Sequence, residues 1–356
     1  MGKAEKPTLI VGAGLAGLAC ALTVRRAGRT VLLFDREEVV GGRVRTDGIE
    51  GYRLDRGFQV LLTAYPEARR FLNFEELDLR SCYPGSRVWF ENRFHREADP
   101  FRKPVDGFGS LFNPIGSLPD KLRVGLLRLG LLSTRSMPDE VTTSQALERL
   151  GFGSSMTDRF WKPFMRGVFL ENGLRTSVRK FEETFRLFAE GETALPRLGI
   201  GEIPKQMARS LPSESLRLGH SIVRVGDRFV ESADGKRWEG RAVVLATESE
   251  VADQLLGLDG DEATPWNSVD CLYFSMPSVD LPTNEPILHL DGSGVGPINN
   301  LTFLSSLSNC APEGRALASA SIIGQGDRDL HGLTEEARGQ LISWFGKKAD
   351  SWDMLK

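Results

Sequence analysis

Three glycines spaced as G-x-G-x-x-G, over residues 12–17, constrain the fold of this chain more than any other feature. They follow Thr8 to Val11, a β-branched and apolar run typical of a strand buried on both faces of a parallel sheet. Glycines at this spacing predict a tight turn, a close approach of the main chain to a diphosphate, and close packing of a helix against a strand. A helix is expected from about Leu15 to Ala27, ended by Gly28, with its N-terminal amides directed at that diphosphate.

The residues after this helix complete a βαβ unit. Thr30 to Phe34 predicts a second buried strand, and it leads to Asp35, the acid expected about 20 residues past the glycines to hold a ribose hydroxyl. A secretory signal peptide is the competing interpretation, because Lys3 and Lys6 precede an apolar run. Glycines inside that run and the lack of a small-residue cleavage site disfavour it, and a spanning helix would need about 20 unbroken apolar residues. The sequence therefore predicts a dinucleotide-binding unit.

The composition is that of an ordinary globular chain with enough residues for two compact units. It has 356 residues, of which 40% are hydrophobic and 26% charged. Its 45 Lys and Arg against 48 Asp and Glu leave a net charge of -3 with no basic block, which argues against a nucleic-acid partner. The four cysteines form no C-x-x-C pair and the four histidines lie at no metal-ligand spacing. We therefore expect no metal site, no disulfide framework and a reducing, cytoplasmic location.

A second glycine motif follows Asp35 by six residues. Gly41, Gly42 and Arg43 make another place where main-chain amides and a guanidinium can meet a diphosphate. Taken by itself, this motif is equally compatible with a simple turn.

The N-terminal string as a whole resembles the family of FAD-dependent amine oxidase, protoporphyrinogen oxidase and phytoene desaturase-like flavoproteins. Besides the glycines of residues 12–17 and Asp35, the matching residues are Gly41, Gly42, Arg43, Thr46, Gly51, Tyr52, Asp55 and Gly57. The resemblance implies FAD as the cofactor, with Asp35 at the adenosine ribose and Arg43 against the pyrophosphate. It also implies an α/β fold, in which a Rossmann-like FAD-binding domain with a parallel sheet and a β-meander is joined to a discontinuous α+β substrate domain with a helical part.

A second block of the same resemblance returns late in the chain. Residues 221–225, 228–232 and 241–246 are expected as three strands, with a hairpin signal at Asp234-Gly235 between the second and third. The resemblance implies that the backbone of Val223 meets the adenine and that Ala246 and Thr247 close over the cofactor. The cofactor-binding residues expected from both blocks are Gly12, Ala13, Gly14, Leu15, Ala16, Gly17, Asp35, Arg36, Gly41, Gly42, Arg43, Val223, Ala246 and Thr247.

The interval between the blocks is helical and aromatic. Ser117 is a plausible cap of a helix that continues as KLRVGLLRLGLL, and this apolar stretch predicts a buried helix, with a substrate-tunnel wall or a membrane-facing patch as alternatives. A further helix near residues 154–162 should stop before Pro163. The aromatic residues Phe160, Trp161, Phe164 and Phe169 are interpreted as core.

The two domains are expected to alternate along the chain. The FAD-binding domain is predicted to comprise residues 1–75 and 199–257, and the substrate domain residues 76–198 and 258–356. In the last of these segments, short apolar strands are expected at residues 271–275, 286–290, 301–304 and 316–323, followed by a helix over residues 333–345.

One part of the family pattern is expected to be absent. The resemblance implies a Gly-Asp or Gly-Glu pair before a last helix that faces the flavin, yet Gly326-Asp327 is followed by Arg328 and lacks the small residues that a close backbone approach needs. This pair is interpreted as a loop, so we expect the C-terminal FAD-binding segment to be missing.

Three hypotheses follow for the function. The first is an FAD-dependent oxidoreductase that abstracts a hydride, by amine oxidation or carbon-carbon desaturation, from a small and partly apolar substrate. The alternatives are a nicotinamide-dependent dehydrogenase and an inactive or incomplete flavoprotein fragment. No catalytic side chain is identified, no transmembrane segment is expected, and peripheral membrane contact stays open; the sequence predicts no oligomeric state.

Overall fold

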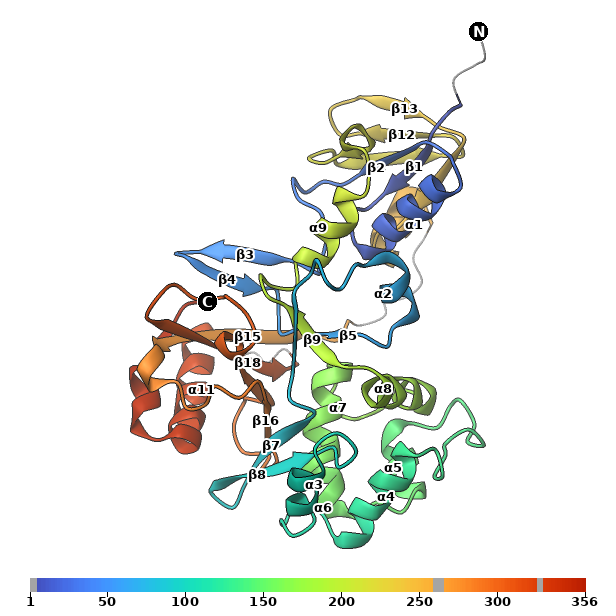
Figure 1. Ribbon diagram of the computed structural model, residues 1–356. Helices are drawn as coiled ribbons and strands as arrows, with labels where there is room; N and C mark the ends of the chain where they lie inside the picture. The colour runs from blue at the N-terminus through green and yellow to red at the C-terminus, as the bar shows by residue number, and fades with distance from the viewer. Residues whose placement is uncertain (1–4, 259–265, 325–328) are drawn as a thin grey trace. The chain divides into compact units, whose positions relative to one another are not determined.

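The computed structural model describes residues 5–258, 266–324 and 329–356, which fall into two units that alternate along the chain (Figure 1). The first unit comprises Met1–Asp47, Pro66–Asp78 and Leu198–Pro265, and the second comprises Gly48–Tyr65, Leu79–Arg197 and Trp266–Lys356. Strands β3 (Thr46–Ile49) and β4 (Tyr52–Asp55) lie where the chain first passes from one unit to the other. The pair Gly326-Asp327, expected as a loop, lies outside the described residues.

The first unit is built on a parallel sheet in the order β10-β2-β1-β14. Its strands are β1 (Thr8–Val11), β2 (Val31–Phe34), β10 (Leu216–Arg217) and β14 (Ala242–Leu245). The helices of this unit are α1 (Leu15–Arg26), α2 (Pro66–Phe71), α9 (Glu202–Arg209), α10 (Ser249–Leu256) and a 3-10 turn at Ser213–Ser215. Ile10 and Leu33 of the sheet pack with Leu18 of α1 and Met207 of α9 in one buried cluster. The expected α/β class is thereby confirmed.

A separate antiparallel meander belongs to the first unit. Its strands are β11 (Ile222–Gly226), β12 (Phe229–Ser232) and β13 (Arg237–Glu239). Three strands were expected over residues 221–246, and the structure has four. The hairpin at Asp234-Gly235 leads into the additional strand β13, and β14 follows it. At Gly240 a Cβ would lie 2.5 Å from the carbonyl oxygen of Pro7, so the chain passes close to β1 there and then enters the parallel sheet.

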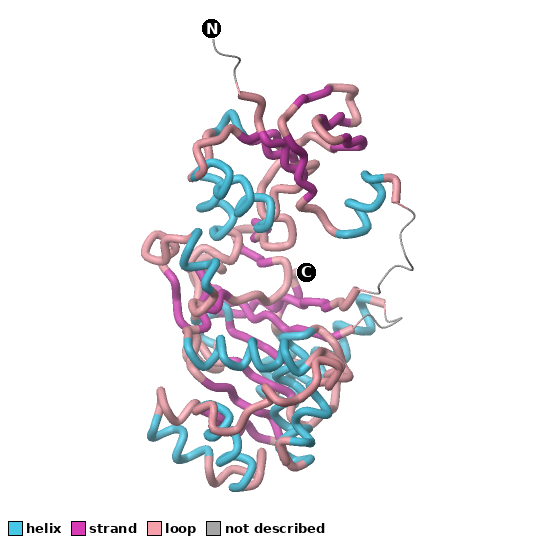
Figure 2. The backbone as a smooth tube through the Cα atoms, turned by 90° about the vertical axis from the view of Figure 1, so that its right-hand side faces the viewer, coloured by secondary structure: helices cyan, strands magenta, loops and turns pink. Residues whose placement is uncertain are grey.

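The second unit is organised by a seven-stranded mixed sheet in the order β19-β15-β18-β17-β16-β7-β8 (Figure 2). Its strands are β7 (Gly85–Phe90), β8 (Arg93–Ala98), β15 (Val269–Pro277), β16 (Leu288–Asp291), β17 (Asn300–Phe303), β18 (Arg315–Ile323) and β19 (Asp353–Met354). A smaller sheet holds β5 (Leu61–Leu62), β9 (Thr193–Pro196) and β6 (Leu79–Ser81). Strands β15, β16, β17 and β18 lie where the apolar runs predicted strands, whereas β19 was not predicted.

Helices pack on both faces of the large sheet. These are α3 (Pro104–Ser110), α4 (Leu118–Arg128), α5 (Thr143–Arg149), α6 (Ser154–Met156), a π-helical turn (Thr157–Trp161), α7 (Lys162–Phe169), α8 (Val178–Glu190) and α11 (Leu330–Phe345), with 3-10 turns at Ser278–Asp280, Leu304–Ser306 and Lys347–Ser351. Trp344 of α11 packs with Trp89 of β7, whereas Trp161 and Phe181 pack with the neighbouring Val88. Because side chains alternate along a strand, these two clusters lie on opposite faces of the sheet.

Two helix expectations were wrong. The helix near residues 154–162 does not stop before Pro163. The short helix α6 leads directly into the π-helical turn, and α7 follows it without a gap from Lys162 to Phe169. Pro163 thus lies in a first turn, where its missing N–H breaks no hydrogen bond. The apolar helix α4 is not buried either.

The buried residues of α4 are polar. Asp120 and Lys121 are buried, whereas Leu118, Leu122 and Leu126 are exposed. Asp120 accepts hydrogen bonds from the amides of Ser117 and Gly153, at 3.0 and 2.8 Å, so this polar side anchors the helix. Val124 and Leu127 are partly buried against the core, and the other three leucines point outward. No helix within the described residues has both the length and the apolar composition to cross a membrane.

Candidate functional site

The glycine turn after β1 is closed by contacts that only glycine permits. Gly12 has φ of +104°, and its amide donates to the carbonyl oxygen of Phe34 at 2.8 Å. A Cβ at Gly12 would lie 2.6 Å from the carbonyl oxygen of Ala246, and one at Gly17 would lie 1.8 Å from that of Gly12. The turn therefore binds β1, α1 and β14 together and leaves no room for side chains.

Gly14 differs from its neighbours because the space beside it is open. A Cβ at this position would meet no atom within 4 Å, and the residue forms the N-cap of α1 with φ of -71°. No side chain caps α1, and its first turn carries no acidic residue. Uncapped amides at the positive end of a helix favour an anion, and the empty space beside Gly14 is a cradle that a side chain would fill.

Asp35, at the end of β2, faces the same turn. Its Oδ2 accepts from the amide of Ala13 at 2.6 Å, and its Oδ1 accepts from the amide of Glu37 at 2.9 Å. The carboxylate thus holds the glycine turn in place and puts a negative charge beside it. Such a charge suits the hydroxyls of a ribose and repels a 2′-phosphate.

The second glycine motif lies directly against the first. The amide of Gly41 donates to the carbonyl oxygen of Ala13 at 2.9 Å, and a Cβ at Gly42 would lie 3.5 Å from the Cα of Gly14. Gly41 and Gly42 have φ of +119° and +57°, where glycine is favoured. Two side-chain-free stretches of main chain therefore border one space.

The other expected residues lie in the same unit. Arg43 is exposed, with Nε 3.7 Å from Glu248 Oε1, and Arg36 is exposed beside Glu37. The amide of Ala246 donates to the carbonyl oxygen of Val11 at 2.8 Å, which places Ala246 at the same sheet edge as the glycine turn. The strand register shifts between Ile222 and Arg224, so Val223 occupies a β-bulge that leaves its backbone outside the regular ladder.

Sequence reasoning missed two neighbours of this site. Glu248 follows Thr247 and pairs with Arg43, and Pro204 of α9 lies 2.9 Å from where a Cβ at Gly41 would stand. Glu248 belongs to no motif of the sequence, and the contact of Pro204 with the second glycine motif is revealed by the tertiary structure.

The second unit contains an apolar cavity of about 500 Å³, and α4, for which a substrate-tunnel wall was one alternative, contributes Lys121, Val124 and Arg128 to its lining. The walls of the cavity include the four aromatic residues interpreted as core, Phe160, Trp161, Phe164 and Phe169. They do pack in a buried cluster, but they also face the cavity. A lining of this kind suits a small and mostly apolar ligand.

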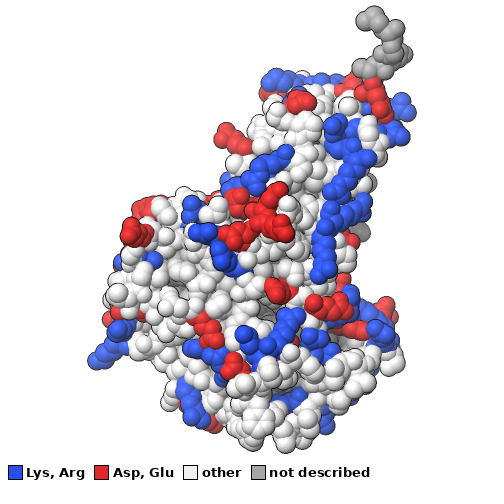
Figure 3. All heavy atoms as spheres, in the orientation of Figure 1, with Lys and Arg blue, Asp and Glu red and all other residues white. Residues whose placement is uncertain are grey.

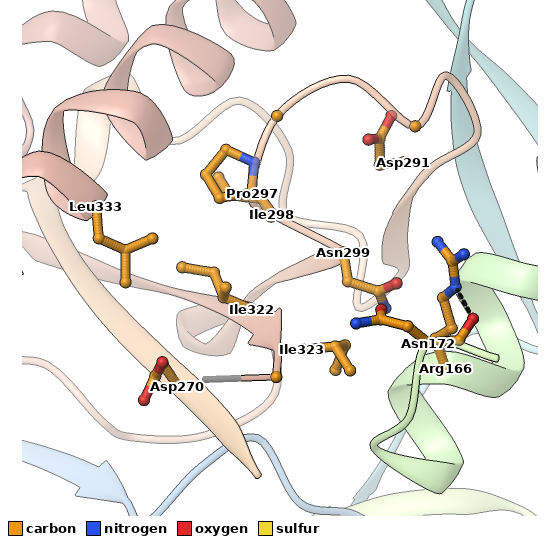
Figure 4. A pocket seen from close by; sticks show the side chains of 13 residues that line it. Arg166, Asn172, Asp270, Asp291, Pro297, Ile298, Asn299, Ile322, Ile323 and Leu333 are labelled. Atoms are coloured by element: carbon orange, nitrogen blue, oxygen red, sulfur yellow. Dashed lines mark hydrogen bonds between the residues drawn. The ribbon is translucent and has the colours of Figure 1, made fainter. Parts of the chain in front are cut away.

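A second cavity of the same unit, of about 340 Å³, is more polar (Figure 4). Polar side chains of this cavity already form hydrogen bonds within the protein. Arg166 Nε donates to the carbonyl oxygen of Asn172 at 3.0 Å, and Asn299 Nδ2 donates to the carbonyl oxygen of Pro163 at 2.8 Å. Asp291 Oδ1 accepts from the amide of Ser293 at 3.0 Å. This cavity offers few free groups to a ligand.

Comparison with known proteins places these features in a family. The model of the flavin-containing amine oxidoreductases matches residues 15–344. A phytoene dehydrogenase of Streptomyces griseus is 29% identical over 283 residues, which cover 70% of this chain and 55% of that protein, so the chain spans about half the length of this curated relative.

Solved structures agree in fold. An oxidoreductase from Methanosarcina mazei is 17% identical, with a TM-score of 0.77 over 98% of this chain and 86% of that chain. A mutant of putrescine oxidase is 16% identical, with a TM-score of 0.71 over 98% of this chain and 84% of that chain. At this identity the likeness shows the fold alone. With the family match, it leads to one conclusion: the chain belongs to the flavin-containing amine oxidoreductases, a family of FAD-dependent oxidoreductases.

Proposed function

We propose that this protein is an FAD-dependent oxidoreductase that acts on a small and partly apolar substrate. It removes a hydride either from a carbon bonded to nitrogen, in amine oxidation, or from one of two adjacent carbons that become double-bonded, in desaturation. The observation that carries the proposal is the open space beside Gly14, bordered by Gly42 and by the uncapped start of α1. When bound, FAD supplies the redox chemistry, and the protein supplies binding and orientation.

The residues around that space take distinct roles in this proposal. The amides of Gly12, Ala13 and Gly41 donate within the protein and shape the turn, and the main chain of residues 14–17 and of Gly42 binds the pyrophosphate. Arg43 neutralises its charge, and Asp35 accepts from the adenosine ribose. The bulged backbone at Val223 contacts the adenine. Ala246 and Thr247 close over the cofactor, and Arg36 lies exposed beside the ribose site.

The apolar cavity of the second unit holds the substrate in this proposal. Its aromatic walls exclude water, which favours hydride removal over side reactions of the reduced cofactor. We assign no side chain to proton transfer.

An exposed apolar surface on the same unit suggests contact with a membrane. Most exposed positions from 104 to 132 are uncharged, although the side chains of Asp106 and Arg123 are 40% and 36% exposed, and Lys103 and Arg135 flank this segment. Its large apolar side chains are Val105, Phe108, Phe112, Leu118, Leu122, Leu126, Leu129 and Leu131. Figure 3 shows the uncharged area at the lower end of the view, where Figure 1 places α3, α4 and α6. An apolar face with flanking cations fits the interface of an anionic bilayer, and we propose peripheral contact there.

The visible absorption spectrum of the protein incubated with FAD and then desalted tests the enzymatic proposal. We expect a flavin spectrum that persists after desalting, and release of free FAD on denaturation. A colourless protein that is stabilised by NAD instead would support a nicotinamide-dependent dehydrogenase and overturn the proposal.

A further inference from the structure

The charged side chains that line the apolar cavity are unequal in number. Among the described residues the lining holds four cations and two anions, namely Arg102, Lys121, Arg128 and Lys180 against Glu97 and Asp99. Two of the cations have an acidic partner of their own: Lys121 Nζ lies 3.5 Å from Glu97 Oε1, and Lys180 Nζ donates to Glu183 Oε2 at 2.8 Å. The excess of positive charge is therefore concentrated at Asp99, Arg102 and Arg128.

Asp99 is shared by two guanidinium groups. It directly follows β8, whereas Arg102 lies three residues further on and Arg128 is the last residue of α4. Asp99 Oδ2 lies 3.7 Å from Arg102 Nε and 3.5 Å from Arg128 Nε. Its Oδ1 accepts from the amide of Phe101 at 2.9 Å. One carboxylate thus faces two positive charges.

The same two arginines contact the carboxyl end of α8. Arg102 Nη2 donates to the carbonyl oxygens of Ala189 and Gly191, at 2.9 and 2.6 Å, and Arg128 Nη2 also donates to that of Ala189. The carboxyl end of a helix carries about half a negative charge. This partial charge and the carboxylate of Asp99 together do not balance two guanidinium groups, so positive charge remains at this side of the cavity.

Both arginines also keep free hydrogen-bond donors. A guanidinium has five N–H donors, and Nη1 of Arg102 and of Arg128 has no hydrogen-bond partner among the described residues. Arg128 Nε is buried, but the two Nη1 groups are not. The side chains of Arg102 and Arg128 are 27% and 24% exposed, and both line the cavity. Two NH₂ groups are therefore available to an acceptor there.

The surroundings of this arginine pair are apolar. Phe101 lines the cavity beside it, with the Cζ of Arg128 5.6 Å from the ring centroid. Phe101 is also 51% exposed, so this side of the cavity reaches solvent. The rings of Phe160 and Phe164, which line the cavity as well, are stacked with their centroids 5.5 Å apart. The cavity thus combines a basic group near solvent with an aromatic wall.

We propose that the cavity binds an apolar molecule that ends in a carboxylate, which accepts from Nη1 of Arg102 and of Arg128. The planar N–H groups of arginine suit the two oxygens of a carboxylate, and the apolar body lies along Phe160 and Phe164. A protonated amine would find both carboxylates of the described lining already paired with cations. This inference rests on the proposed function, since it names the substrate class of the same enzyme.

Isothermal titration calorimetry at pH 7.5 with three ligands of equal chain length tests the proposal on the FAD-treated protein: decanoate, decanol and decylamine. The three differ only in the charge of the polar end. We expect one decanoate per chain, bound about tenfold more tightly than decanol, because a hydrogen bond to a charged group contributes more than a neutral one. Decylamine should bind more weakly than decanol. Affinity for decanol or decylamine that equals or exceeds the affinity for decanoate would overturn the proposal.

One variant and its matched control localise the effect. Arg128→Met removes the guanidinium and keeps an apolar stem, so decanoate should bind about tenfold more weakly while the Kd of decanol changes by less than about twofold. The control is Arg166→Met, because Arg166 lines the more polar cavity and likewise donates to a backbone carbonyl. It should bind decanoate like the wild type.

Equal losses for decanoate and decanol in Arg128→Met would contradict the assignment, and the comparison of ligands on the wild type holds even if this variant fails to fold. The flavin spectrum of the same samples separates the two proposals. A protein that retains FAD but does not prefer decanoate refutes only this inference, whereas a protein that loses FAD refutes the enzymatic proposal.

Discussion

At the scale of single residues, the glycines of the N-terminal turn have different physical roles. Gly12 and Gly17 lack side chains because main-chain atoms of Ala246 and of Gly12 occupy the space that a Cβ would need. Gly14 instead borders open space and has an ordinary φ of -71°, and we propose that a ligand fills this space. The spacing predicted all three glycines of the turn, but only the structure separates the fold-required glycines from Gly14.

Gly14→Ala should leave the fold intact and remove FAD binding. Alanine is compatible with the φ of -71°, and its methyl group would stand in the space assigned to the pyrophosphate. We expect the Kd for FAD to rise at least about tenfold, measured by flavin fluorescence, with a loss of stability of about 1 kcal/mol at most from the changed helix cap.

The control for this variant is Gly339→Ala, which adds a methyl group in α11 where a Cβ also meets no atom within 4 Å. Its Kd for FAD should not change. Unchanged binding in Gly14→Ala would show that the open space is not the cofactor site.

His289 should make the protein less stable in acid. It is fully buried, both ring nitrogens lack hydrogen-bond partners, and Phe94 and Phe303 contact the ring. Burial, and then the charge of Arg87, lower the pKa of His289 to about 3. The unfolded chain therefore binds a proton below its ordinary pKa of about 6.5 while the folded chain does not, so stability falls as the pH drops from 6.5 towards 3.

The measurement is the free energy of unfolding in urea at pH 7.5 and at pH 5. Wild type should lose about 2 kcal/mol more than His289→Leu between these two values, since 1.5 pH units below the unfolded pKa correspond to about that amount. Identical pH dependence of the two proteins would show that this histidine is not held neutral.

At the scale of elements, the spacing of apolar residues and the positions of glycine and proline predicted where many helices and strands lie. The βαβ unit follows from apolar runs with glycines at their ends, and strands β15 to β18 follow from apolar runs. Strand β13 was missed because its three residues are mostly polar and exposed, and the continuation of α7 past Pro163 depends on a π-helical turn that leaves no sequence signal. Burial of α4 was predicted wrongly, since apolar composition cannot tell a core face from an interaction surface.

Charged substitutions on α4 should abolish membrane contact without unfolding the chain. Leu122 and Leu126 are 59% and 42% exposed, so glutamate at both positions stays hydrated. We expect the wild type to sediment with vesicles of phosphatidylcholine and phosphatidylglycerol, and the Leu122→Glu, Leu126→Glu variant to stay in solution.

A matched control is Leu256→Glu on α10, which replaces a leucine of 55% exposure in the first unit and should sediment like the wild type. If wild type and the α4 variant partition alike, the exposed leucines serve another purpose.

At the scale of the whole molecule, the chain builds two units from interleaved segments. The candidate cofactor site could be predicted from sequence because a dinucleotide turn needs specific glycines and one acid within a short stretch. The cavity as a whole could not, because its lining comes from β7, β8, β16 and β17 and from several helices, and no local pattern records that assembly.

Saturation with FAD should raise the thermal stability of the protein. A ligand that binds only the folded state at about 100 times its Kd adds about 2.7 kcal/mol. Differential scanning calorimetry should therefore show a higher Tm with FAD, with a smaller rise for Gly14→Ala. An equal rise in both proteins would mean that FAD binds away from the glycine turn.

A calorimetric titration of the purified protein with FAD and, separately, with NAD shows whether the glycine turn binds FAD. We expect saturable binding of one FAD per chain at the site beside Gly14 and no measurable heat from NAD at the same concentrations. Heat from NAD alone, or from neither coenzyme, would contradict this expectation.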